Sequence, residues 1–177
     1  MPGQDFSDSD LIAGLEARGV RYLRPATISP AHQAIPTPEL VARLASHPAP
    51  RFRETLIPLF LAHPEYAELL PACTAALPPD TAVVLKHFYT AAVYLQRMWR
   101  GNLESLLGAF PDLPDHYGQS EFKLPAPDDY FGEKGLRQLA RCFEALTGAN
   151  WWQTYQDVIE LFMKQLGLRM AQVEPGS

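Results

Sequence analysis

Cysteine is nearly absent from this chain of 177 residues, which has only Cys73 and Cys142. The two thiols lie far apart in the sequence, and apolar residues flank both of them. A chain of this length buries about 70% of the surface that its unfolded form exposes, so it needs no disulfide scaffold. We therefore predict that both cysteines are small core residues, and a disulfide between them is the less favoured alternative.

No apolar run in the sequence is long enough to cross a membrane. Lys86 and Arg97 interrupt the most apolar stretch, and the uncharged run at 55–64 is about half the length that a bilayer requires. The first ten residues are acidic and contain no positively charged segment followed by an apolar one, so they do not resemble a secretory signal. The sequence predicts no membrane contact and a cytoplasmic location.

An excess of basic residues is also lacking, because the formal net charge is −5. Residues 1–101 hold nine basic and nine acidic side chains, whereas residues 102–177 hold six basic and eleven acidic ones. A protein that binds nucleic acids generally carries a basic stripe. The charge distribution therefore argues against a general nucleic-acid binder, although a local basic face remains an alternative.

The sequence has no nucleophile elbow of the form Gly-x-Ser-x-Gly and no glycine-rich phosphate loop. Asp112, Asp115 and His116 have the atom types of metal ligands, but no second histidine or cysteine lies near them. We interpret them as part of a solvated acidic loop, and Asp128-Asp129 as part of a turn. The sequence therefore predicts neither a metal nor a cofactor.

Proline and amphipathic segments, in contrast, are abundant. The 17 prolines separate stretches in which apolar residues recur at steps of three and four, which is typical of helices with one buried face. We predict an all-α fold, in which residues 1–167 form a single-domain bundle of six to seven helices. The main departures are an extended arm at 20–36, an irregular proline- and aromatic-rich segment at 109–132, and a flexible tail at 168–177.

Local signals fix the expected helix ends. Ser7 and Gly19 bracket a first helix at 8–18, and Thr37 precedes Pro38 at the start of a second. A third helix at 50–62 contains Pro58, which predicts either a kink or two short helices that meet. The other expected helices span 64–77, 81–100 with Asp80 as its cap, 133–147 and 151–166, the last two as an antiparallel hairpin that ends at Gly167.

The helix at 81–100 is apolar on most sides, which places it at the centre of the bundle. His87 lies on it beside Lys86, and we interpret it as a histidine at the polar edge of the helix rather than as a proton-transfer group. In the alternative interpretation, His87 joins Tyr89 and Tyr94 as the polar groups of an interhelical pocket.

Five residues are candidate contacts for a partner or an anion: Arg51, Arg53, Arg97, Arg100 and Trp151. Cations at the C-terminal end of a helix are expected from the helix dipole alone, so Arg97 and Arg100 do not require a ligand. Arg51 and Arg53 lead into the helix at 50–62 instead. A patch that holds phosphate or an acidic partner, formed if the arginine groups meet in space, is the less favoured alternative. Trp151 and Trp152 point about 100 degrees apart on a helix, so one of the two rings is a candidate protein contact.

We interpret the chain as a non-enzymatic, protein-binding subunit or regulatory partner in a multi-protein system. A bacterial source is suggested only by the content of alanine, leucine, proline and arginine. The first alternative is a small-molecule-binding protein or enzyme with a pocket near His87. The second is a nucleic-acid-associated factor that uses the arginine clusters.

Overall fold

The computed structural model describes residues 5–21 and 33–173, and within these ranges the chain forms helices and no strand. The predicted all-α fold is therefore confirmed. The α-helices are α1 (Asp8–Ala17), α2 (Thr37–Ser46), α3 (Pro50–Glu54), α4 (Leu56–Ala62), α5 (Leu70–Ala76), α6 (Pro79–Met98), α7 (Arg100–Leu107), α8 (Glu133–Thr147) and α9 (Trp151–Val173). Two 3₁₀ segments, η1 (Pro64–Leu69) and η2 (Asp129–Gly132), join them. Most of the expected extended arm at 20–36 lies outside the described residues.

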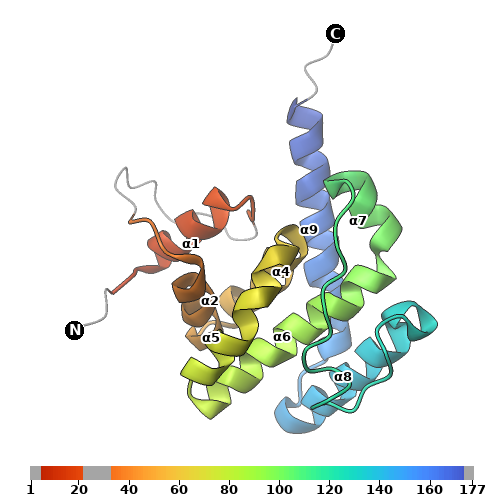
Figure 1. The fold of residues 1–177 in the computed structure, drawn as a ribbon. Helices are drawn as coiled ribbons and strands as arrows, with labels where there is room; N and C mark the ends of the chain where they lie inside the picture. The colour runs from red at the N-terminus through yellow and green to blue at the C-terminus, as the bar shows by residue number, and fades with distance from the viewer. Residues whose placement is uncertain (1–4, 22–32, 174–177) are drawn as a thin grey trace.

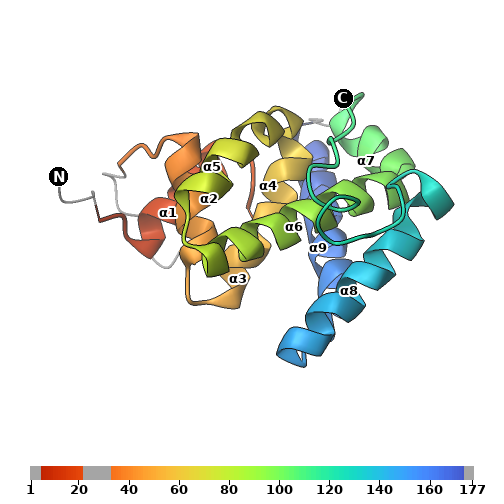
Figure 2. The ribbon, with the colours of Figure 1, turned by 60° about the horizontal axis from the view of Figure 1, so that its bottom comes forward.

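Helix α6 runs through the middle of the molecule, and the helices other than α1, which packs on α2, pack around it (Figures 1 and 2). It contacts α4 and α2 on one side and α8 and η2 on the other. An unbroken run on α6, residues 87–96, is buried, including the polar side chains of His87, Thr90 and Gln96. A single core cluster connects α6 to residues of α1, α2, α4, α8 and α9, so the predicted central position of this helix is confirmed.

The helix ends that have strong local signals lie where the sequence places them. Ser7 and Asp10 form a reciprocal capping box at the start of α1. Helix α8 begins after Gly132 and ends at Gly148, and both glycines have a left-handed backbone. The Asn150 side chain accepts a hydrogen bond of 3.1 Å from the Gln153 amide at the start of α9.

Other expected boundaries differ in position. The expected third helix consists of two short helices that meet, α3 and α4, as one of the two predicted alternatives has it. They meet at Thr55, and Pro58 lies in the first turn of α4, where its missing amide donor breaks no helical hydrogen bond. Helix α6 spans 79–98 rather than 81–100 and starts with Pro79, so Asp80 lies inside its first turn instead of capping it. Thr37 likewise forms the first residue of α2 and makes no capping bond there.

Helix α9 continues to Val173, so the predicted helix end at Gly167 is wrong, and residues 168–173 of the predicted tail are helical. The rest of that tail, 174–177, lies outside the described residues. A glycine ends a helix when it adopts a positive φ, and Gly167 does not. A guanidinium Nη2 atom of Arg169 also donates a hydrogen bond of 2.8 Å to the Gly19 carbonyl, which ties this last part of α9 to the end of α1. Helices α8 and α9 pack against each other across the turn at 148–150.

Two side chains of α8 differ from expectation. Cys73 is buried as predicted, but Cys142 is exposed, and both thiols are free. Leu146, which continues the apolar repeat of Leu136, Leu139 and Phe143 along the helix, is nevertheless 76% exposed. The buried face of α8 consists of Leu136, Leu139, Ala140 and Phe143. Cys142 is exposed because it lies about 100 degrees away from Phe143 around the helix, and Leu146 belongs to the last turn of the helix. None of the described helices combines the length and the apolar character that crossing a bilayer requires.

Candidate functional site

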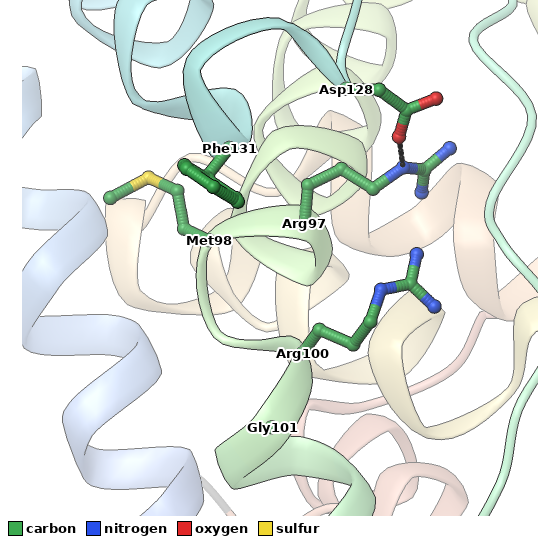
Figure 3. Close-up of a pocket in the computed structure, with 6 residues that line it drawn as sticks. All are labelled: Arg97, Met98, Arg100, Gly101, Asp128 and Phe131. Atoms are coloured by element: carbon green, nitrogen blue, oxygen red, sulfur yellow. Dashed lines mark hydrogen bonds and ion pairs between the residues drawn. The ribbon is translucent and has the colours of Figure 1, made fainter.

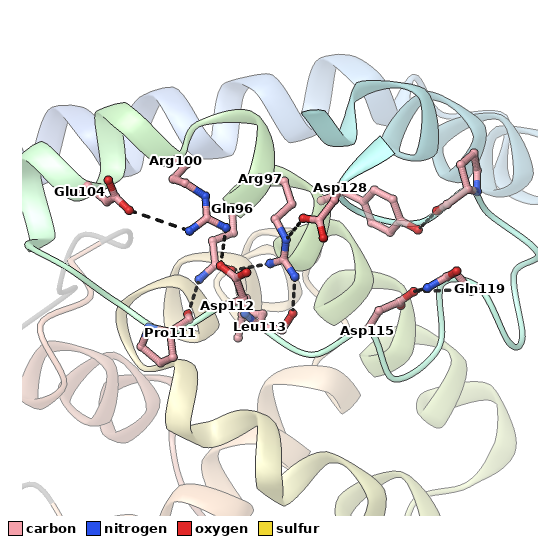
Figure 4. A network of polar contacts seen from close by, with 12 residues as sticks. Gln96, Arg97, Arg100, Glu104, Pro111, Asp112, Leu113, Asp115, Gln119 and Asp128 are labelled. Carbon is pink, nitrogen blue, oxygen red and sulfur yellow. Dashed lines mark hydrogen bonds and ion pairs between the residues drawn. The ribbon is translucent and has the colours of Figure 1, made fainter. Parts of the chain in front are cut away.

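The irregular segment at 109–132 is fastened to the end of α6 by the side chain of Gln96 (Figure 4). Gln96 is fully buried; its amide nitrogen donates a 3.2 Å hydrogen bond to the Pro111 carbonyl, and its oxygen accepts a 2.8 Å bond from the Leu113 amide. One side chain therefore satisfies two main-chain groups of a segment without regular structure.

Two arginines at the same helix end bind the segment through charge. Arg97 donates to the Leu113 carbonyl at 3.0 Å and to Asp128 at 3.1 Å (Figure 4). Arg100 binds Asp112 and lies 3.8 Å from Glu104. The hydrogen bond from Arg100 lowers the pKa of the Asp112 carboxyl and raises the pKa of the arginine itself.

Two buried tyrosines of α6 bind the segment at 109–132 at two further positions, Pro114 and Pro125. The Tyr89 hydroxyl donates to the Pro114 carbonyl at 2.5 Å, and the Tyr94 hydroxyl donates to the Pro125 carbonyl. Burial raises the pKa of both hydroxyls, so both remain donors at neutral pH. Tyr89 and Tyr94 thus serve as anchors for the segment at 109–132.

The residues considered as metal ligands have separate contacts. Asp112 binds Arg100, Asp115 accepts hydrogen bonds from the amides of Gly118 and Gln119, and His116 bonds to the Ala67 carbonyl. Within the part of the chain that the structure describes, no group of three acidic, histidine or cysteine side chains is arranged to hold a metal ion.

The segment ends in a turn that exposes two aromatic rings. Tyr130 and Phe131 are 67% and 82% exposed, and both have a left-handed backbone, with φ of 53° and 55°. Such a conformation costs about 1–2 kcal/mol for each residue that is not glycine. The next residue, Gly132, has φ of 82° and packs so closely on α6 that a Cβ atom would lie 2.6 Å from the Tyr94 carbonyl oxygen. The close contact with α6 therefore fixes the turn in its strained conformation.

A hollow of about 400 Å³ lies beside this turn, over the junction of α6 and α7. Its lining consists of Arg97, Met98, Arg100, Gly101, Asp128 and Phe131. Figure 3 shows Phe131 next to Met98, whereas the guanidinium groups of both arginines point away from these two side chains and toward the side of Asp128. The hollow therefore has an apolar wall and a charged wall.

The structure brings only two of the five predicted contact residues together. Arg97 and Arg100 line the hollow, whereas Arg53 donates to the carbonyls of His47 and Pro48, and the Arg51 guanidinium lies 5.5 Å from the Phe52 ring centre. Figure 2 shows α3, which carries Arg51 and Arg53, apart from α7. Arg51 and Arg53 therefore form no common patch with Arg97 and Arg100.

Trp151 lies in a cluster of aromatic rings around His87. The His87 ring stacks on Phe143 at 3.6 Å between ring centres, with Trp151 edge-on at 4.6 Å, and its Nε2 atom lies 2.5 Å from the Tyr155 hydroxyl. His87 is only 2% exposed, so its expected place at the polar edge of the helix is wrong. Burial lowers its pKa to about 3, which makes it a neutral core residue at physiological pH.

Sequence reasoning missed Tyr130, Phe131, Met98 and Gly101 as site residues. The turn itself was predicted from Asp128-Asp129, but nothing in the sequence shows that the two rings after it point outward. The available signal is Gly132, whose position after two aromatic residues is compatible with a backbone of positive φ.

Comparisons with models of protein families, with curated proteins and with solved structures find no match to this chain.

Proposed function

We propose that this protein binds another protein through the Phe131 surface, defined as Met98, Arg100, Gly101, Asp128, Tyr130 and Phe131. The observation that carries the proposal is the 82% exposure of Phe131 on a turn that the rest of the fold holds in place. Burying a phenylalanine that water otherwise surrounds contributes about 1.5–3 kcal/mol to an association. A large exposed ring is therefore a strong candidate for a binding anchor.

The order of the turn supports the same function. Association has a cost in conformational entropy whenever a flexible group must become fixed. At the Phe131 surface this cost is small, because Gly132 packs against α6 and the Tyr94 hydroxyl holds the preceding part of the segment at Pro125. Met98 lies beside the ring, and the exposed Asp128 lies on the opposite, charged side of the hollow; apolar groups at the centre with charged groups at the edge are typical of a protein interface.

The two alternative functions have less support. His87, Tyr89 and Tyr94 are buried, and each already has a hydrogen-bond partner in the fold, so they offer no exposed polar group to a substrate. Arg97 and Arg100 are paired with carboxylates, which weakens any attraction for phosphate. The proposal includes a cytoplasmic, bacterial multi-protein system as the setting, on the composition arguments given above.

Affinity purification from cells that make the protein, followed by measurement of the dissociation constant with the purified partner, tests the proposal. Phe131→Ala is expected to raise the dissociation constant by about 30-fold or more, the effect of losing an interface hot spot. Leu146→Ala is the matched control, because Leu146 is equally exposed but lies at the far end of α8. Equal effects of the two substitutions would contradict the proposal.

A further inference from the structure

The Phe131 surface contains a protruding ring and a hollow side by side. Phe131 forms one wall of the hollow, yet most of its ring remains exposed and projects from the turn. The hollow, at about 400 Å³, is in the size range of pockets that hold a small molecule, so it can accept a benzyl side chain. A surface with both a projection and a matching hollow is able to pair with itself.

Its charges are self-complementary as well. The side chain of Arg100 is 38% exposed although it binds Asp112, and the exposed Asp129 has no ion pair with any of the described residues. Asp128 is 81% exposed although it binds Arg97. When two copies of one surface meet about a two-fold axis, each positive group of one copy can face a negative group of the other.

We infer that the partner at the Phe131 surface is a second copy of this chain, in a two-fold dimer in which each Phe131 ring enters the hollow of the other copy. This inference rests on the proposed function and names its partner. The ring then packs on Met98 and Phe131 of the other copy and lies above Gly101. A Cβ atom at Gly101 would have no neighbouring atom within 4 Å, so this space is open. The charged wall forms the rim.

The apolar part of this contact is small. Stable interfaces bury about 1,200–2,000 Å² in total, and one aromatic side chain supplies about 150–250 Å² of this. Two exposed rings per copy therefore form the centre of a modest interface. We expect a reversible dimer with a dissociation constant on the order of 10–100 μM.

Sedimentation velocity of the purified full-length protein across a concentration series tests the inference. The wild-type chain should pass from monomer to dimer between about 5 and about 500 μM. Phe131→Ala removes the projection, and Gly101→Leu fills the hollow at a position with no neighbouring atom within 4 Å. Each variant alone should remain monomeric over this range, whereas Leu146→Ala should dimerise like the wild type. Circular dichroism confirms that the variants are folded.

The concentration series decides the inference. Phe131→Ala removes both the projecting ring and the wall that this ring forms in the hollow, whereas Gly101→Leu occupies the hollow and leaves the ring in place. Either variant that dimerises like the wild type overturns the inference, and so does a wild-type chain that stays monomeric at about 500 μM. If that monomer still binds a different protein through Phe131, the proposed function stands and only the identity of the partner is wrong.

Discussion

Gly135→Ala tests the close approach of α8 to α6. A Cβ atom at position 135 would lie 2.1 Å from Cε1 of Tyr94, whereas carbon atoms in contact are about 3.5–4.0 Å apart. The Tyr94 ring cannot retreat easily, because its hydroxyl binds the Pro125 carbonyl and Gly118 lies against its other edge. Overpacking of this kind costs about 1–3 kcal/mol, and the large overlap places this site at the upper end.

The direction of the change in stability is informative, because replacing a glycine by alanine inside a helix normally stabilises the helix by about 1 kcal/mol. Gly101→Ala in α7 is the matched control: its Cβ atom meets nothing within 4 Å, so it should leave stability unchanged or increase it by up to about 1 kcal/mol. Urea unfolding followed by circular dichroism measures both. We expect the midpoint of Gly135→Ala to fall by about 1 M with an unchanged m value. A midpoint equal to or above that of the wild type would refute the close contact between Gly135 and Tyr94.

The remaining predictions concern the anchor, the buried histidine and the exposed ring. Gln96→Leu leaves two main-chain groups of the 109–132 segment without a partner, so it should lower the free energy of unfolding by about 1–3 kcal/mol and speed hydrogen exchange at the Leu113 amide; unchanged exchange there would contradict the anchoring role. Because the pKa of His87 falls from 6.5 in the unfolded chain to about 3 in the fold, the unfolded state takes up a proton that the folded state does not. The contribution of His87 to the free energy of unfolding is therefore complete above pH 6.5. Below pH 6.5 it should decline by up to about 1.4 kcal/mol per pH unit. His87→Leu should show a shallower decline between pH 6.5 and 5 in denaturant titrations, and an identical slope would refute the assignment. Phe131→Ala should change the free energy of unfolding by less than about 0.5 kcal/mol, since the ring is 82% exposed; a larger loss would indicate a packing role instead.

The sequence predicts those parts of the fold that depend on local interactions. The capping box of α1 and the glycines around α8 act within one turn of the residues that they cap, so their effects are readable from neighbouring positions. The continuation of α9 past Gly167, in contrast, is accompanied by a contact between Arg169 and Gly19, which are 150 positions apart and so cannot be paired from neighbouring positions. The break between α6 and α7 at Trp99 likewise has no proline or glycine at that residue to announce it.

The candidate site was less predictable for the same reason. Arg97 and Arg100 could be selected from the sequence as a pair, because they lie three residues apart at one helix end. Their carboxylate partners Asp128 and Asp112 come from a segment without periodicity, whose path is set by Gln96 and the two tyrosines. The left-handed backbone at Phe131 follows from that path and not from the intrinsic preference of phenylalanine, which disfavours it.

The central claim is that the Phe131 surface is where this protein meets another protein. A photo-crosslinking amino acid placed at position 131, and in a second strain at position 146, tests it directly in growing cells, because adducts form only with molecules in contact with that position. We predict a discrete protein adduct at 131, of another protein or of a second copy of the chain, and none at 146 above background. Adducts of equal yield at the two positions, or none at 131, would contradict the account.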